Sequence, residues 1–114
     1  MNLVITSVSP TSTLISFSNE SLDAGNAKAF RDEIAPVMET TDTLFLDMSR
    51  LNFVDSSGLG SLLSCLRTMN AKAGSMRLFG ITKPVLALFE LVRMHRLFSI
   101  YLTKEDAEQD IQKI

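Results

Sequence analysis

The hydrophobic positions of the chain fall into short β-rich runs and longer runs with helical spacing. Two short runs, Leu3 to Val8 and Thr13 to Ser18, flank the turn-forming sequence SPTS and together predict a hairpin. The dense apolar run from Thr43 to Ser49 predicts a buried strand. Residues 75–81, SMRLFGI, and a short run from Ser99 to Leu102 predict two more strands.

Two longer segments between these strands carry apolar residues at the three- and four-residue spacing of a helix. In the first, Asp23 is a plausible N-cap, and Pro36 is expected to kink or shorten the helix. In the second, which follows Asp55, Gly74 is expected to end the helix in a left-handed conformation. The two apolar faces consist of Ala27, Phe30, Ile34 and Val37 in the first helix, and Leu59, Leu62, Leu63, Leu66 and Met69 in the second.

Two further helices are predicted in the last third of the chain. Thr82 is expected to cap the first of them, and Pro84 suits its first turn. The charged segment from Lys104 to Lys113 forms the second. The buried face of the helix after Thr82 is expected to consist of Val85, Leu88, Phe89 and Val92.

The order of these elements is strand, strand, helix, strand, helix, strand, helix, strand, helix. Strands joined through a helix usually lie parallel, with right-handed crossovers. Such crossovers place successive helices on one face of the sheet unless the winding direction reverses. The pattern therefore predicts an α/β fold, with a small mixed β-sheet of four to five strands and helices mainly on one face. Residues 1–114 are expected to form a single domain.

Composition and charge narrow the class of protein. Hydrophobic residues make up 46% and charged residues 21% of the chain, an ordinary globular composition. The net charge of −2 and the lack of a Lys/Arg run disfavour direct binding to nucleic acid. No signal-peptide pattern and no apolar run near the roughly 20 residues of a membrane helix are present, so no membrane association is expected. The single cysteine, Cys65, excludes an internal disulfide, and a cytoplasmic protein is the simplest expectation.

The sequence FVDSSGLGSLL, residues 53–63, carries the candidate chemistry. It holds two adjacent serines and two of the chain's five glycines, where a strand is predicted to pass into a helix. In open α/β sheets, ligands bind near the carboxyl ends of the strands, and a helix N-terminus favours anions. The location therefore predicts a function that involves an anionic group.

Three chemistries fit these residue types poorly. A nucleotide P-loop ends in Lys-Ser or Lys-Thr, and here no lysine follows until Lys72. A nucleophile elbow needs glycine two positions before the serine, where Val54 or Asp55 stands, and the only histidine is His95. The candidate metal ligands show no characteristic spacing. The sequence therefore predicts no catalysis, no cofactor and no metal.

Two interpretations of the motif remain open. In the first, Asp55 or Ser56 only caps the helix, and the glycines let it approach the sheet. In the second, Ser56 is the first helical residue and accepts a phosphate, which the helix dipole tolerates but a docked partner does not. Gly58 and Gly60 then leave room for another protein's active site. The second accounts for both glycines, since glycine inside a helix costs roughly 0.8–1 kcal/mol relative to alanine.

Residues 44–74, LFLDMSRLNFVDSSGLGSLLSCLRTMNAKAG, resemble the core of the STAS domain family, in particular its bacterial anti-sigma-factor antagonists. The shared features are a hydrophobic strand, an Asp-Ser-Ser-Gly-Leu-Gly signature, and a helix that ends near a glycine. The segments LDAGNAKAFRDEI and MRLFGITKPVLALFELVRMHRLFSIY are similar to the family's first helix and to its later strand, helix and strand. The resemblance covers nearly the whole chain and implies the STAS fold.

The resemblance also implies a phosphorylation-controlled binding protein that is not an enzyme. In the family, a partner that is both anti-sigma factor and ATP-dependent serine kinase phosphorylates the serine that corresponds to Ser56. Ser57 occupies a position where the family tolerates Thr or Ala, and it is the second candidate here. The unphosphorylated form binds this kinase and frees its sigma factor, and a PP2C-type phosphatase restores that form. Asp23 matches an acidic residue near the phosphorylated serine. The implied partner-binding residues are Asp23, Asp55, Ser56, Ser57, Gly58, Leu59 and Gly60.

A second hypothesis is a constitutive interaction or scaffold subunit, either stressosome-like or transporter-associated, that phosphorylation does not control. Leu86, Leu91 and Met94 lie outside the main helix faces and offer such a subunit a contact surface unless the core buries them. The two hypotheses differ in whether Ser56→Asp changes partner binding. Under either one, the domain is expected to be a monomer or a weak dimer.

Overall fold

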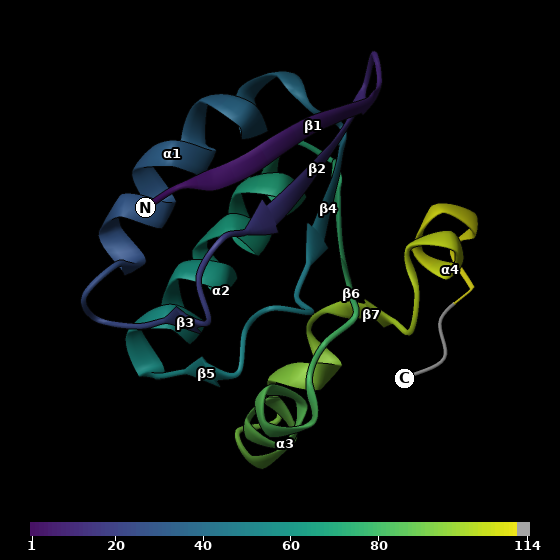
Figure 1. The fold of residues 1–114 in the computed structure, drawn as a ribbon. Helices are drawn as coiled ribbons and strands as arrows, with labels where there is room; N and C mark the ends of the chain where they lie inside the picture. The colour runs from purple at the N-terminus through teal and green to yellow at the C-terminus, as the bar shows by residue number, and fades with distance from the viewer. Residues whose placement is uncertain (112–114) are drawn as a thin grey trace.

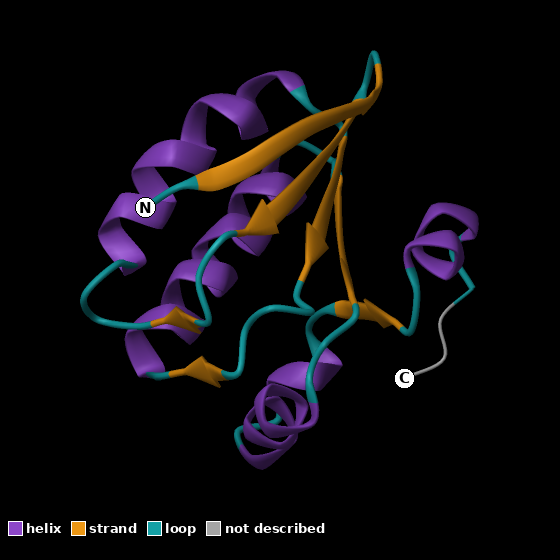
Figure 2. Cartoon of the chain, viewed as in Figure 1, coloured by secondary structure: helices purple, strands orange, loops and turns teal. Residues whose placement is uncertain are grey.

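The chain folds into a central β-sheet with helices packed mainly against one face (Figures 1 and 2). In the computed structural model, which describes residues 1–111, this sheet has five strands in the order β1-β2-β4-β6-β7. β1 and β2 are antiparallel, and each later neighbour is parallel. The predicted mixed sheet is therefore confirmed. Its strands are β1 Leu3–Ser9, β2 Ser12–Phe17, β4 Thr43–Asp47, β6 Ser75–Phe79 and β7 Ser99–Tyr101.

Alternation along the strands divides the apolar residues between two layers. In β4, Leu44 and Leu46 belong to the main core with the three longer helices, whereas Phe45 packs on the other face with Tyr101 and Ala107 of α4. The expected helices mainly on one face are thus confirmed. The helices are α1 Ala27–Thr40, α2 Ser56–Ala71, α3 Lys83–Leu91 and α4 Lys104–Gln109, with a short 3₁₀ helix, η1, at Met94–Arg96.

A second, two-stranded sheet was not predicted from the sequence, because its strands are too short to show a periodic pattern. β3, Ser21–Leu22, pairs in parallel with β5, Phe53–Val54. The pairing joins the segment before α1 to the segment before α2, two regions about thirty residues apart in sequence. It thereby places the start of α2 against the loop that precedes α1 (Figure 1).

The start of α1 differs from the prediction. The N-cap position belongs to Asn26 rather than Asp23, and the helix begins at Ala27. The Asp23 carboxylate instead accepts a hydrogen bond from the Gly25 N–H at 2.9 Å, and its carbonyl accepts from Asn26 and Ala27. Asp23 therefore shapes the turn before the helix. Pro36 does not shorten the helix, which continues to Thr40, because this proline lies on the exposed side where water can solvate the freed carbonyl.

The end of α2 also corrects the prediction. Ala73, not Gly74, adopts the left-handed conformation, with φ of 60°. The Gly74 N–H reaches the Met69 carbonyl at 2.8 Å, and the Ala73 N–H reaches the Asn70 carbonyl at 3.1 Å, which is the Schellman pattern. Position 74 favours glycine for a steric reason, since a Cβ there would lie 2.8 Å from the Asp42 carbonyl oxygen.

The helix after Thr82 is shorter than predicted. Thr82 occupies the N-cap position, but its hydroxyl donates to the Leu51 carbonyl at 2.6 Å instead of capping α3. The helix ends at Leu91, so Val92 lies beyond the buried face and is 48% exposed. Leu91 itself is 80% exposed, whereas Leu86 and Met94 pack partly against the core.

The segment from Lys104 to Lys113 forms a helix only as far as Gln109. Asp110 turns left-handed there, with φ of 57°, and ends α4. Residues 112 and 113 of the predicted helix lie outside the described residues.

Candidate functional site

The start of α2 is held in place by a single carboxylate. Asp55 is the N-cap residue, and its Oδ1 accepts a hydrogen bond from the Gly58 N–H at 2.9 Å, as predicted for a cap. Its Oδ2 accepts from the Ala24 N–H, in the loop before α1, at 3.0 Å. Asp55 therefore ties together the two segments that β3 and β5 bring side by side.

These hydrogen bonds favour the charged form of Asp55. The Gly58 N–H, with a further contribution from the Ala24 N–H, holds the pKa of the Asp55 carboxyl below its ordinary value of 3.8, against the opposing effect of desolvation. A carboxyl whose pKa is depressed on folding stabilises the protein above the unfolded-state pKa. This stabilisation is lost as the pH falls through the folded-state pKa.

We expect Asp55→Asn to make the domain's stability less sensitive to acid. Asn retains a capping oxygen but has no carboxyl to protonate. Between about pH 5 and about pH 3, the urea midpoint of the wild type should therefore fall farther than that of the variant. Unfolding followed by circular dichroism at both pH values provides the comparison. Equal losses in the two proteins would mean that the Asp55 carboxylate contributes nothing to acid sensitivity.

The two glycines of the motif have different surroundings. A Cβ on Gly58 would lie 2.1 Å from the Leu22 carbonyl oxygen, so only glycine permits α2 to approach β3 this closely. A Cβ on Gly60 would meet no described atom within 4 Å. Between them, Leu59 is only 8% exposed and packs in the core. Gly58 and Leu59 thus pack the first turn of α2 against the rest of the fold, while Gly60 adds no side chain to the exposed surface of the site.

The two serines stand on the exposed side of this first turn. Ser56 and Ser57 are the first two residues of α2 and both are exposed. Neither hydroxyl has a hydrogen-bond partner among residues 1–111. Asp55 performs the capping, so both hydroxyls are free to react or to contact another molecule.

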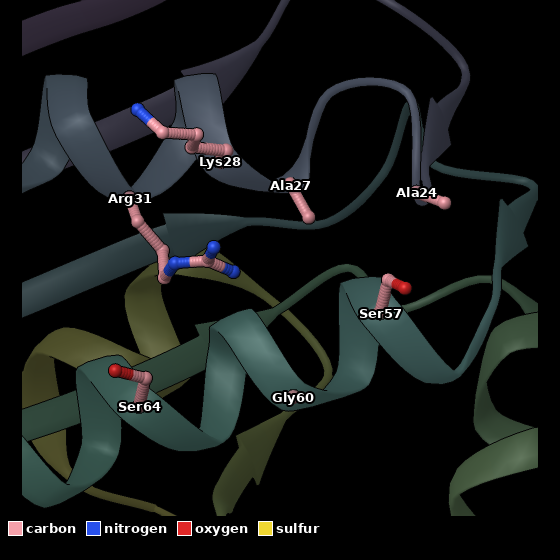
Figure 3. Close-up of a pocket in the computed structure, with 7 residues that line it drawn as sticks. All are labelled: Ala24, Ala27, Lys28, Arg31, Ser57, Gly60 and Ser64. Carbon is pink, nitrogen blue, oxygen red and sulfur yellow. The ribbon is translucent and has the colours of Figure 1, made fainter.

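A groove of about 490 Å³ runs between α1 and α2 beside the serines (Figure 3). The Arg31 guanidinium extends from α1 toward α2 and lies between Ser57 and Ser64, while Lys28 pairs with Asp32 at 2.8 Å. Ser57 lines this groove and Ser56 does not, so the two hydroxyls face different surroundings. The groove is lined by Ala24, Ala27, Lys28, Arg31, Ser57, Gly60 and Ser64.

The sequence prediction included neither Lys28 nor Arg31. The available signal was their spacing of three on α1, together with the spacing of seven between Ser57 and Ser64 on α2, which places each pair on one helix face. The predicted Asp23 is half-buried next to Ala24, with its carboxylate turned to Gly25. The structure thus brings the Asp23 segment, Asp55 and both serines to one corner of the fold.

Other candidate chemistry is sparse in the part of the chain that the structure describes. Within residues 1–111, no three His, Cys, Asp or Glu side chains gather closely enough to hold a metal ion. Burial raises the pKa of the Cys65 thiol to about 12, so the thiolate is not accessible near neutral pH. Over the same residues, no helix has both the length and the apolar character to cross a membrane.

Fold and site together define a small α/β domain that presents an exposed serine pair at a capped helix N-terminus. The chain belongs to the STAS domain family, whose model matches residues 4–107. This match spans both β1 and α4 and so covers the sheet, the helices and the site.

Two curated relatives are anti-sigma factor antagonists. The chain is 28% identical over 71 residues to the anti-sigma F factor antagonist of Paenibacillus polymyxa, with 62% of this chain and 61% of that protein covered. It is 22% identical over 88 residues to the anti-sigma-B factor antagonist of Bacillus subtilis (strain 168), with 77% and 81% covered. The chain therefore spans about three-fifths of the first relative's length and four-fifths of the second's.

Solved structures share the fold. The unphosphorylated form of the anti-sigma factor antagonist SpoIIAA superposes with a TM-score of 0.79 and 23% identity, over 96% of each chain. The phosphorylated form of the Bacillus SpoIIAA gives a TM-score of 0.72 and 22% identity, over 97% of this chain and all of that one. The same architecture thus occurs with and without phosphate on a protein of this fold.

Proposed function

We propose that this chain is an antagonist of an anti-sigma factor, switched by phosphorylation of Ser56. The unphosphorylated chain binds a partner that combines anti-sigma activity with an ATP-dependent serine-kinase domain, and so frees a sigma factor. Phosphorylation ends this binding, and a PP2C-type phosphatase reverses it. The observation that carries the proposal is the exposed Ser56 hydroxyl at the first position of α2, which has no hydrogen-bond partner within residues 1–111 because Asp55 supplies the cap. Two relatives named as anti-sigma antagonists support it.

The phosphoryl transfer requires only that the partner reach Ser56. Its Oγ attacks the γ-phosphorus of ATP held by the kinase, the bond to the β,γ-bridging oxygen breaks, and ADP leaves. The hydroxyl proton passes to a base of the kinase. Because Gly60 has no side chain, nothing protrudes at this position to hinder the approach of the kinase. The chain thus serves as substrate and ligand, not as catalyst.

The position of Ser56 explains how a phosphate can change binding without unfolding the domain. A phosphate there lies at the positive end of the α2 dipole, an arrangement worth about 0.3–1 kcal/mol. The same charge within a docked interface would be desolvated and would repel acidic groups of the partner. Ser57 differs because it lines the groove beside Arg31, so a phosphate there would face a cation of the same chain.

The phosphorylation site can be tested with a matched pair of variants. Wild type, Ser56→Ala and Ser57→Ala are incubated with ATP and lysate of the source organism, recovered, and measured by intact mass. We expect one added phosphate on wild type and on Ser57→Ala, and none on Ser56→Ala. Phosphate on Ser56→Ala but not on Ser57→Ala would move the site to Ser57. Equal phosphorylation of all three would contradict both positions.

A constitutive interaction subunit is the second candidate function. The observation that favours it is a set of exposed apolar residues around the end of α3, remote in sequence from the serines: Leu91, Val92 and Leu97. A partner that docks there would bind regardless of phosphate on Ser56. Partner binding that is unchanged by Ser56→Asp would favour this function over the switch.

A further inference from the structure

The outer edge of β1 is unusual for a strand at the margin of a sheet. β1 pairs with β2 on one side, and no other strand among residues 1–111 lies on its outer side (Figure 1). Natural proteins generally protect such an edge with lysine, proline or a bulge. β1 carries no charged residue, and the first charged side chain of the sequence is Glu20. The one protective feature is a bulge between Ser7 and Ser9, which leaves Leu3 to Ser7 regular.

Both sides of this regular segment expose apolar side chains. Val4 is 54% exposed and Ile5 is 49% exposed, although these adjacent residues point to opposite faces of the sheet. Leu3 packs partly against the main core, so Ile5 lies on the helix-covered face and Val4 on the other. Unpaired backbone groups and exposed β-branched side chains therefore occupy the same edge.

We propose that β1 pairs in antiparallel fashion with β1 of a second copy of this chain, across a two-fold axis at Ile5. In this register Ile5 faces Ile5 of the other copy, and Val4 faces Thr6. Such cross-strand pairs of β-branched residues stabilise antiparallel sheets. The two five-stranded sheets then join into one continuous sheet. The contact is isologous, so it closes at two copies and does not propagate into fibres.

The uncharged, β-branched sequence of β1 favours a second copy as the occupant of this edge. Each chain carries a net charge of −2, which opposes self-association at long range. Because no ionisable side chain lies on β1, pairing the two strands sets no like charges of β1 opposite each other. The three central residues, Val4, Ile5 and Thr6, are all β-branched, so the two-fold register sets similar side chains opposite each other there. The dimer is expected to be weak, since one strand pair contributes a small interface.

Sedimentation velocity across a concentration series tests the dimer. We expect the wild type to shift from one chain toward two as its concentration rises toward about 1 mM, since small interfaces bind weakly. Ile5→Lys places two lysines opposite each other and should raise the dissociation constant at least about tenfold. Val8→Lys adds the same charge at the bulge and should have a smaller effect. A wild type that stays monomeric throughout, or an Ile5→Lys variant that dimerises like wild type, would overturn the proposal.

Disulfide trapping tests the register. The only native cysteine, Cys65, is fully buried, so an introduced cysteine can be oxidised without competition. Ile5→Cys should form a covalent dimer under mild oxidation, because the two-fold axis brings its two copies together. Val8→Cys, at the bulge, should cross-link much more slowly. Equal rates for the two variants would exclude this register. Neither experiment involves Ser56, so its outcome is independent of the proposed switch.

Discussion

Phosphorylation of Ser56 is expected to lower the affinity of this domain for the proposed anti-sigma kinase about a hundred- to a thousandfold. A phosphate adds a charge of roughly −1.5 to −2, which at a docked interface must be desolvated and repels acidic neighbours. A loss of about 3–4 kcal/mol corresponds to that change in affinity. The fold should stay intact, since Ser56 is exposed at the positive end of α2.

Calorimetric titration of the proposed kinase, purified on immobilised wild-type protein, with unmodified and phosphorylated protein would measure the change. Ser56→Asp should act in the same direction with a smaller effect, because it adds only one negative charge. Thr68→Asp is the matched control, since it adds the same charge at an exposed position on the same helix. Equal affinities for wild type and Ser56→Asp, with unchanged circular dichroism, would remove Ser56 from the interface and leave the constitutive subunit as the better explanation.

Gly58→Ala is expected to destabilise the domain by about 2 kcal/mol and to lower its melting temperature by about 10 °C. The new Cβ would lie 2.1 Å from the Leu22 carbonyl oxygen, a backbone atom that cannot rotate aside. The same oxygen accepts a hydrogen bond from the Asp55 N–H at 3.3 Å, so its displacement would also disturb the cap of α2. The better helix propensity of alanine offsets only up to about 1 kcal/mol of the loss.

Gly60→Ala provides the matched control, two residues away on the same helix. A Cβ there meets no described atom within 4 Å, so only the gain in helix propensity remains. Its melting temperature should rise by a few degrees. Thermal unfolding of the three proteins side by side makes the comparison. If Gly58→Ala melted at or above the wild-type temperature, the close approach of α2 to β3 would not depend on glycine.

The sequence predicted the main elements because each carries its own periodic signal. The leucine-rich face of α2 and the dense apolar run of β4 identified those elements, and the crossover rule placed the helices. The predictions failed mainly at the ends of elements. Asp23 and Gly74 belong to residue types that often terminate helices, yet Asn26 and Ala73 occupy the terminal positions here. Contacts with neighbouring chain segments decided which residues occupy these positions. A local sequence pattern carries no information about such contacts.

The candidate site likewise has features that the local sequence predicted and features that depend on tertiary packing. That Asp55 caps α2 and leaves Ser56 as its first residue could be inferred from the motif alone, since capping depends on a few consecutive residues. The groove with Arg31 could not, because it requires α1 and α2 to pack side by side. The motif likewise did not distinguish its two glycines. Their difference depends on β3, which lies against Gly58 and not against Gly60.

The sequence by itself therefore determined the types of the main elements, the two faces of the sheet and the capped serine pair, all properties of residues close together in the chain. Only the tertiary structure decided which residues from distant segments meet. It brings Ala24 to Asp55, Arg31 to the groove beside Ser57, and β1 to an edge of the sheet. The physical reason is that period, propensity and capping act over a few residues, whereas packing and strand order join segments whose separation leaves no pattern in the sequence.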